Sequence, residues 1–278
     1  PAGQAHGFLA GKKIQQMRVP VKMIRLLRGV ALAALTVCLL ALTGRQVKKQ
    51  DDMPCNAVLV GIDTDNGMAF IDSADVLKLL ENTLADSLLN RPLHSIPVAE
   101  MEAVVLSSPY ADQADVYLDA VGNIHVDVVQ KQPVARIINK NGVHYYMDEK
   151  ANKFPVHPTF TCRVPVVTGN ISESLSEGDT IQSAELKNAY EIIMYMNTSD
   201  LWKAQLEQLQ VRGDGVFEFV PKIGGTVVLG KAEDLESKLD KLELFYREGL
   251  NYTDWDRYSR IDLTYRDQIV CTKKQAWE

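Results

Sequence analysis

The stretch ADVYLDAVGNIHVDVV (residues 114–129) decides how the first folded part of this chain is built. Apolar and polar side chains alternate from Ile124 to Val129, and a period of two is typical of a half-buried strand. Turn-forming residues at 120–123 separate this strand from a second one at 114–118. The stretch therefore predicts a pair of strands with one apolar face that other elements must cover.

Two amphipathic helices are expected just upstream of this pair. The first follows Ser73, which suits an N-cap, and apolar residues spaced by three and four positions from Val76 to Leu84 form one face. The second begins near Pro97 and ends before Ser108, because the residue before a proline disfavours helix. With a short strand at 58–62, the order strand, helix, helix, strand, strand predicts a small sheet covered on one face.

The rest of the chain predicts a second, mainly β unit with two helices, so the fold class is α+β. Asn141–Gly142 is a strong hairpin signal between two short strands. Strands are expected at 134–138, 143–147, 164–167, 206–211, 216–220 and 226–229, helices at 183–196 and 232–248, and one long final strand at 260–272.

An apolar run near the N-terminus, GVALAALTVCLLALTG (29–44), predicts a transmembrane helix. Sixteen residues at ~1.5 Å each span about 24 Å, short of the ~30 Å hydrocarbon core, so the helix is expected to cover 26–44 while Arg28 snorkels outward. A cleaved signal peptide is the alternative, with small residues at 41–44 as a weak cleavage site. Basic residues directly after the run favour a retained anchor.

The charges around this run predict its orientation. Six basic residues precede it and the first 49 positions contain no acidic residue, so the positive-inside rule places the N-terminus in the cytoplasm. The expected organisation is a basic cytoplasmic tail (1–25), the transmembrane helix (26–44), a stalk (45–55), a first module (56–133), a β domain (134–273) and a C-terminal tail (274–278).

The composition of the exported part excludes some partners. Residues after position 49 carry 21 basic and 36 acidic side chains, and such an acidic surface repels nucleic acid and anionic lipid. Three cysteines lie beyond the anchor without a CxxC spacing, which favours buried free thiols over a disulfide framework.

No motif for catalysis is present: the chain lacks GxSxG, HExxH, SxxK and a Walker loop. We therefore expect no enzyme, no catalytic residue, no cofactor and no small-molecule substrate. His157 and Cys162 lack a completing pair at ligand spacing, so no metal site is expected. A membrane-anchored wall hydrolase is the enzyme alternative, and it would need a pocket joining Glu173, Glu177 and Asp179.

An aromatic group near the C-terminus, Tyr252, Trp255 and Tyr258, leaves two interpretations open. The residues either fill the core under the last helix or form an aromatic anchor beside a binding edge.

Four stretches match, in order, stretches of one known family. They are RPLHSIPVAEMEAVVLSSPYADQADVYLDAVGNIHVDVVQKQPVARI (91–137), HYYMDEKANKFP (144–155), VPVVTG (164–169) and RIDLTYRDQIV (260–270). With the basic tail and the single anchor, the chain resembles the bacterial cell-division family FtsQ/DivIB. The first stretch looks like the family's first exported module, a POTRA domain, running into its β domain.

The resemblance implies a non-enzymatic scaffold of the divisome in the inner membrane at the division septum. Proteins of this family bind the small membrane proteins FtsB (DivIC) and FtsL outside the cytoplasm and so help to recruit and regulate the septal peptidoglycan synthase complex. It also implies a second surface on the POTRA-like module, on its helices or at 58–62. Another POTRA-bearing envelope assembly or secretion factor is the alternative, although such proteins usually carry tandem POTRA units.

The resemblance implies binding by strand addition, in which a partner segment pairs with a C-terminal edge strand. Ile261, Leu263 and Tyr265 would share one face of that strand. The expected partner-binding residues are Arg260, Ile261, Asp262, Leu263, Thr264, Tyr265, Arg266, Gln268 and Ile269, with Trp255 and Tyr258 beside them.

The sequence departs from the family pattern at two positions. Ala151 stands in a turn where the family usually has Gly, so we expect Asn152 to adopt the left-handed conformation. Thr264 stands where many relatives have Arg, and Arg260 and Arg266 are the expected substitutes for that contact.

Overall fold

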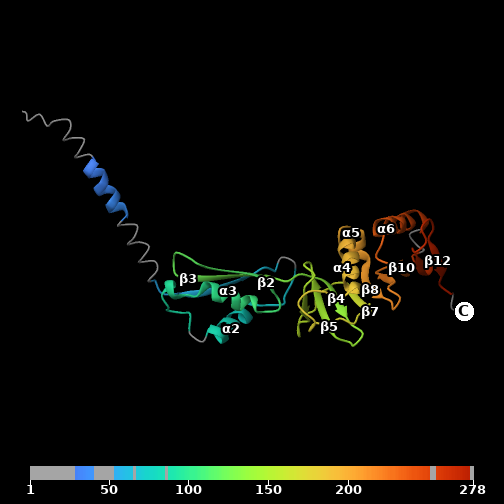
Figure 1. Ribbon diagram of the computed structural model, residues 1–278, viewed down its shortest axis with the longest axis horizontal. Helices are drawn as coiled ribbons and strands as arrows, with labels where there is room; N and C mark the ends of the chain where they lie inside the picture. The colour runs from blue at the N-terminus through green and yellow to red at the C-terminus, as the bar shows by residue number, and fades with distance from the viewer. Residues whose placement is uncertain (1–28, 41–52, 65–66, 85–86, 251–254, 276–278) are drawn as a thin grey trace, which may run out of the picture.

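The computed structural model describes residues 29–40, 53–64, 67–84, 87–250 and 255–275, and Figure 1 shows two modules side by side along its long axis. One module is built on a three-stranded sheet and the other on a nine-stranded sheet, which confirms the α+β class. Residues 29–40 are helical, and the remainder of the predicted anchor lies outside the described residues. In the described part of the chain we find no helix whose length and hydrophobicity together would suffice for a membrane span.

The first module has the predicted order strand, helix, helix, strand, strand. Its sheet order is β1-β3-β2, with β1 parallel to β3 and β2 antiparallel to it. Helices α2 and α3 pack on one face, over the fully buried Ile124, Val126 and Val128. The elements are β1 (Ala57–Ile62), α2 (Ser73–Leu84), the short helix η1 (Leu93–Ser95), α3 (Val98–Leu106), β2 (Ala111–Leu118) and β3 (Asn123–Gln130).

The start of α2 differs from the prediction by one residue. Asp72 rather than Ser73 caps the helix: its Oδ1 accepts the N–H of Asp75 at 2.7 Å, and its own N–H donates to Asp75 Oδ2 at 3.2 Å. The two aspartates therefore satisfy free backbone donors reciprocally at the N-terminus, where a negative charge is also favoured by the helix dipole.

Gln130 ties the loop before α2 to the end of the sheet. Its side-chain Oε1 accepts the N–H groups of Phe70 and Ile71 at 2.8 and 3.0 Å, while Nε2 donates to the carbonyls of Asp63 and Met68. This buried amide satisfies four backbone groups, and the two bonds to Phe70 and Ile71 hold the Phe70 ring against the second module.

The second module is one mixed sheet in the order β12-β11-β10-β9-β8-β7-β4-β5-β6. Helices α4 and α6 contribute Leu186, Ile193 and Leu242 to the buried cluster on one of its faces. The strands are β4 (Pro133–Ile138), β5 (His144–Asp148), β6 (Lys153–Pro155), β7 (Val166–Gly169), β8 (Leu206–Val211), β9 (Phe217–Pro221), β10 (Thr226–Gly230), β11 (Tyr258–Asp262) and β12 (Val270–Lys273). The helices are α4 (Ala184–Asn197), α5 (Asp200–Gln205) and α6 (Leu235–Leu244), which continues as the π-helical turn η2 (Phe245–Gly249).

An aromatic cluster joins the two modules. The buried Phe70 ring stacks on Tyr110 of the first module at 5.6 Å and meets the rings of Phe154 and Phe160 edge-on at 5.8 and 4.9 Å. Tyr146 of β5 also packs on Phe70 at 5.7 Å, so one apolar cluster runs from the first sheet into the second. Aromatic pairs of this kind add to the gain from burying their area, which makes the junction a packed interface rather than a linker.

A buried ion pair fixes the loop between β7 and α4. Lys153 Nζ lies 2.7 Å from Glu173 Oε1, and both side chains are almost fully buried. The carboxylate also accepts the N–H groups of Gln182 and Ser183, and the ammonium donates to the carbonyls of Ser174 and Glu177. Burial alone raises the pKa of Glu173, but these hydrogen bonds outweigh it and hold the pKa below its usual value.

Replacing Glu173 by Gln is expected to lower the free energy of unfolding at neutral pH by about 3 kcal/mol, because Lys153 keeps a buried charge without a carboxylate partner. The folded-state pKa of Glu173 lies below the unfolded-state one, so its contribution is present above a pH of about 4.3 and is lost as pH falls. Urea unfolding at a series of pH values measures both effects. The exposed Glu177→Gln is the control, and equal losses in the two variants would contradict the assignment.

Ala151 itself adopts the left-handed conformation, with φ at 62°, so the expectation that Asn152 would take this role is wrong. Asp148 explains the difference. Its Oδ1 accepts the N–H groups of Lys150 and Asn152 and its Oδ2 accepts the side-chain amide of Asn152, which holds Asn152 at the end of the turn.

Ala151→Gly is expected to raise the free energy of unfolding by about 1 kcal/mol, since a residue with a Cβ is strained at positive φ. Chemical denaturation of the two proteins measures the change. Asn152→Gly is the matched control and should destabilise, because it removes the amide bonded to Asp148. A lower stability for Ala151→Gly would contradict the strain argument.

Candidate partner-binding edge

The C-terminal segment forms two strands, so the prediction of one strand across 260–272 is wrong. β11 pairs in parallel with β10, with Ile261 opposite Val227, and antiparallel with β12, with Ile261 opposite Cys271. β11 is therefore an internal strand, and the predicted open edge at Arg260–Asp262 does not exist. The two edges of the nine-stranded sheet are β12, at the C-terminal end of the chain, and β6, at the junction with the first module.

Asp262 ends β11 through its side chain. Its Oδ1 accepts the N–H of Thr264 at 2.9 Å and the hydroxyl of Thr264 at 2.6 Å, a local turn that competes with strand continuation. From helix α6, Lys241 Nζ donates to the carbonyls of Tyr265 and Arg266 and holds the turn against the helix. Ile261 and Leu263 are buried as expected, but Tyr265 is 49% exposed and does not share their face.

β12 leaves one side of its backbone open. The N–H of Lys274 donates to the carbonyl of Arg257 at 3.0 Å. Because backbone groups alternate in direction along an antiparallel ladder, the N–H and C=O groups of Thr272 and Val270 also point toward β11. The backbone groups of Cys271 and Lys273 then point away, and within the described ranges no other strand pairs with them.

The side chains at this edge differ between its faces. Cys271 and Ile269 pack partly against the core, and burial raises the pKa of the Cys271 thiol. On the other face Val270 is 41% exposed and Thr272 is also exposed, while Lys273 follows Cys271 on the first face and is exposed at the end of the strand. An added strand would thus contact apolar side chains beside backbone N–H and C=O groups that are free to pair with it.

Arg260 is held by an ion pair on the sheet. Its Nη1 donates to Glu218 Oε1 at 2.9 Å, and Arg212 donates to the same oxygen at 3.1 Å. Glu218 lies on β9, so this bond crosses β10 and reinforces the placement of β11. Of the two expected arginines, only Arg266 lies in the exposed turn, together with the exposed Gln268.

Trp255 and Tyr258 lie under the end of the last helix. The Trp255 ring packs on Tyr246 at 4.9 Å, and Tyr258 packs on Phe245 at 6.0 Å. Both side chains are partly buried against the main core, which supports the core-filling interpretation; Tyr252 lies outside the described residues.

The side chains considered for chemistry have structural partners. Glu173 is saturated by Lys153 and two backbone N–H groups, and His157 Nδ1 faces the N–H groups of Thr159 and Phe160. Across the part of the chain that the structure describes, we find no group of three or more His, Cys, Asp or Glu side chains that could hold a metal ion.

Sequence reasoning chose the inner strand of this hairpin and missed Val270–Lys273 as the edge. The signal that could have located it is the polar run Arg266–Asp267–Gln268, which separates two apolar stretches as a hairpin turn does.

The fold defines a class of proteins in which a POTRA-type module precedes a mixed β domain that ends in an edge hairpin. Residues 53–129 match a family model described as a POTRA-like domain, and residues 132–272 match one described as FtsQ/DivIB, C-terminal related. The second match spans more than half of the 278 residues, and the chain belongs to the FtsQ/DivIB family. No curated protein was found to match the chain. Members of this family are non-enzymatic scaffolds of the division-site membrane.

Lys241→Met is expected to accelerate hydrogen exchange across residues 264–270 severalfold, because the turn loses its bonds to α6 while the methionine keeps most of the apolar stem. Exchange measured by mass spectrometry tests this. Lys238→Met is the control on the same helix, since Lys238 Nζ donates to the carbonyl of Lys231 instead. Equal acceleration at 264–270 in both variants would rule out a specific role for Lys241.

Proposed function

We propose that this chain is a single-pass membrane scaffold of the divisome that binds an FtsB/DivIC-like protein by strand addition at β12. An FtsL-like protein joins the same complex, which supports the septal peptidoglycan synthases. The family membership supports the scaffold role, and the open side of β12 is the one observation that carries the binding mode.

Strand addition at β12 satisfies backbone groups that are otherwise left to water. A segment laid beside β12 pairs with the N–H and C=O groups of Cys271 and Lys273. Each hydrogen bond adds about 0.5–1.5 kcal/mol net, so a ladder alone gives modest affinity and side-chain contacts supply the rest. Val270 and Tyr265 are the exposed apolar side chains beside this edge.

The proposed partner-binding residues therefore lie on β12 and the turn before it, and no longer on β11. Ile261 and Leu263 act as core residues that hold β11 in place, and Arg260 does so through Glu218. The turn of Thr264–Ile269 and strand β12 are the parts that meet the partner. A truncation after Ser259 would remove buried residues and is therefore a poor test of binding.

The proposal keeps the topology expected from the sequence. A transmembrane helix at 26–44 includes the helical residues 29–40, with the basic tail in the cytoplasm and both modules outside it. The module at 56–133 then lies nearer to the membrane along the chain than the domain at 134–273.

Cys271→Pro is expected to weaken binding of the FtsB-like partner at least about tenfold. Proline removes the outward N–H of an edge strand without removing a bond to β11. Calorimetric titration of the full chain with the partner's extracytoplasmic segment measures the affinity. Cys271→Ala is the matched control, because it also loses the thiol but keeps the N–H, and it should bind within about twofold of the parent.

Two further results decide the proposal. Photocrosslinkers placed in turn at Val270, Cys271, Thr272 and Lys273 should capture the FtsB-like protein, whereas the same probe at Glu207 on internal strand β8 should not. Unchanged affinity of a folded Cys271→Pro protein would overturn binding at this edge.

A further inference from the structure

A cavity at one end of the nine-stranded sheet collects positive charge. It has a volume of about 430 Å³ and lies where β7 and β8 begin and where β9 ends. Its charged lining residues are Arg163, Lys203, Lys222 and Glu207, so three cations and one carboxylate give the lining a net charge of +2. The rest of the wall is mainly apolar and includes Val164.

The three cations have no carboxylate partner of their own. Among the residues that the structure describes, the side chains of Arg163, Lys203 and Lys222 form no ion pair or hydrogen bond, and all three are exposed. Elsewhere in the same module basic side chains are paired, as Lys153 is with Glu173. The charge around the cavity is therefore available to a ligand.

The backbone around Arg163 is fixed on both sides. The N–H of Cys162 donates to the hydroxyl of Tyr146 at 3.1 Å, and the carbonyl of Pro165 accepts the N–H of Arg136 at 2.9 Å. Pro165 also has a restricted φ, which further limits the freedom of this segment. Only the side chain of Arg163 has to become ordered when a ligand binds, and this keeps the entropic cost of binding low.

Gln205 brings the two lysines to the same place. The N–H of Lys222 donates to the Gln205 carbonyl at 2.7 Å, which joins the end of β9 to the end of helix α5. Trp202, next to Lys203 on α5, is buried, and its ring packs on Phe219 at 6.4 Å. The helix is thus anchored in the core, while Lys203 itself stays exposed at the cavity.

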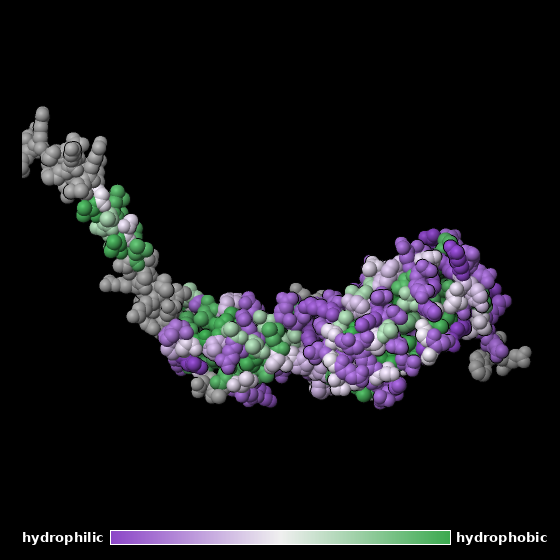
Figure 2. All heavy atoms as spheres, in the orientation of Figure 1, coloured by the Kyte–Doolittle hydropathy of each residue, from purple (hydrophilic) through white to green (hydrophobic). Residues whose placement is uncertain are grey.

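The charge of the cavity is opposite to that of its surroundings. The chain after position 49 carries 21 basic and 36 acidic side chains, and Figure 2 shows hydrophilic residues over most of the visible face of the second module. An acidic surface repels an anionic bilayer or a large polyanion that has to approach it broadly. A small anion that fits into the cavity is instead attracted by the local positive charge.

The charge of the lining also selects among small anions. A carboxylate or a phosphodiester carries one negative charge and leaves half of the +2 unbalanced. A phosphomonoester carries about −1.5 to −2 at pH 7 and presents three strong acceptor oxygens, as many as there are cations. The planar fork of Arg163 suits two such oxygens at once. The cavity therefore favours a phosphomonoester over the singly charged anions.

We propose that Arg163, Lys203 and Lys222 form a binding site for a small soluble phosphomonoester such as a sugar phosphate. The phosphate lies among the three cations, and the organic group lies against the apolar wall at Val164. The headgroup of phosphatidic acid carries the same chemistry, but the acidic surface disfavours its bilayer. The site does not rest on the proposed function, because none of its residues belongs to β12 or to the turn before it.

Calorimetric titration with glucose 6-phosphate tests the site in the full chain, held in phosphatidylcholine nanodiscs. We expect saturable binding with a Kd below about 1 mM. Glucuronate, a sugar carboxylate with one negative charge, is the control and should bind at least about tenfold more weakly. Sedimentation with vesicles of phosphatidylcholine and phosphatidic acid is the second arm, and there we expect no more binding than to phosphatidylcholine alone.

Substitutions with opposite expected effects separate binding from folding. Lys203→Met and Lys222→Met should each weaken glucose 6-phosphate at least about fivefold, because each removes a positive charge and keeps most of the apolar stem. Glu207→Gln should tighten binding about threefold, because it removes the negative charge of the lining. Lys187→Met is the matched control: Lys187 is an exposed lysine of α4 outside the cavity, and its variant should bind within about twofold of the parent.

A loss of affinity in Lys203→Met and Lys222→Met together with a gain in Glu207→Gln supports the site, whatever the titration at β12 gives. Equal affinity for glucuronate and glucose 6-phosphate, equal losses in Lys203→Met and Lys187→Met, weaker binding by Glu207→Gln, or no measurable binding would each overturn it. Binding to phosphatidic acid vesicles without binding to the sugar phosphate would overturn the soluble ligand.

Discussion

The packing of Phe70 between the two modules is the contact on which the architecture depends. Gln130 fixes the backbone of Phe70 at the end of the first sheet, and the ring then meets Tyr146, Phe154 and Phe160 of the second module. Tyr110 adds a hydrogen bond to the carbonyl of Val156 at 3.3 Å, and Lys150 pairs with Asp112 at the surface. Two sheets with separate strand orders thereby share one apolar cluster.

The parts of the fold that sequence predicts well are those with local signals. The period of two in β3 and the spacing of three and four in α2 each describe a buried face, and the structure confirms both. The short elements β6 and α5 were missed because three to six residues give too little periodicity. The conformation of Ala151 could not be predicted for a similar reason. The hydrogen bonds that Asp148 accepts from the turn decide which residue takes positive φ.

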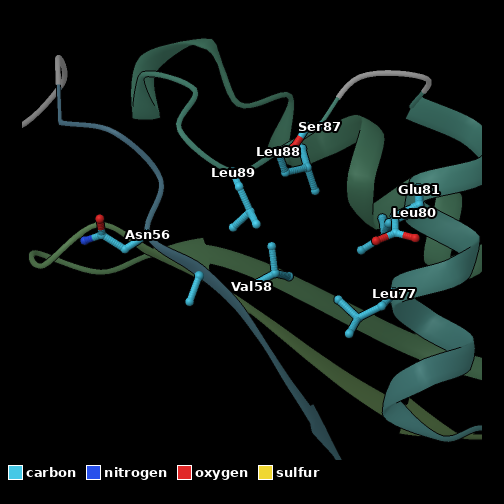
Figure 3. Close-up of a pocket in the computed structure, with 9 residues that line it drawn as sticks. Asn56, Val58, Leu77, Leu80, Glu81, Ser87, Leu88 and Leu89 are labelled. Carbon is cyan, nitrogen blue, oxygen red and sulfur yellow. The ribbon is translucent and has the colours of Figure 1, made fainter.

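The candidate edge was only partly predictable for a related reason. Ile261 and Leu263 alternate as an edge strand would, yet β11 lies inside the sheet because it pairs with β10 across about thirty residues of sequence. The break after Asp262 combines a local signal, its bond to Thr264, with a distant one, the contact from Lys241. Only the first can be read from the sequence alone. The cavity between β1 (Ala57–Ile62) and α2 could not be predicted either, because it depends on where the loop residues 87–89 lie beside the helix (Figure 3).

Figure 1 shows β12 at the end of the second module that lies farther from the first, beyond the aromatic junction. Because Phe70 and its neighbours pack between the sheets, one module can rotate against the other only by breaking this aromatic cluster. If a partner segment pairs with β12 as proposed, a pull on it would reach the first module through packed side chains rather than through a flexible linker. The two modules would then act as a strut of set length that transmits tension between two points of an assembly.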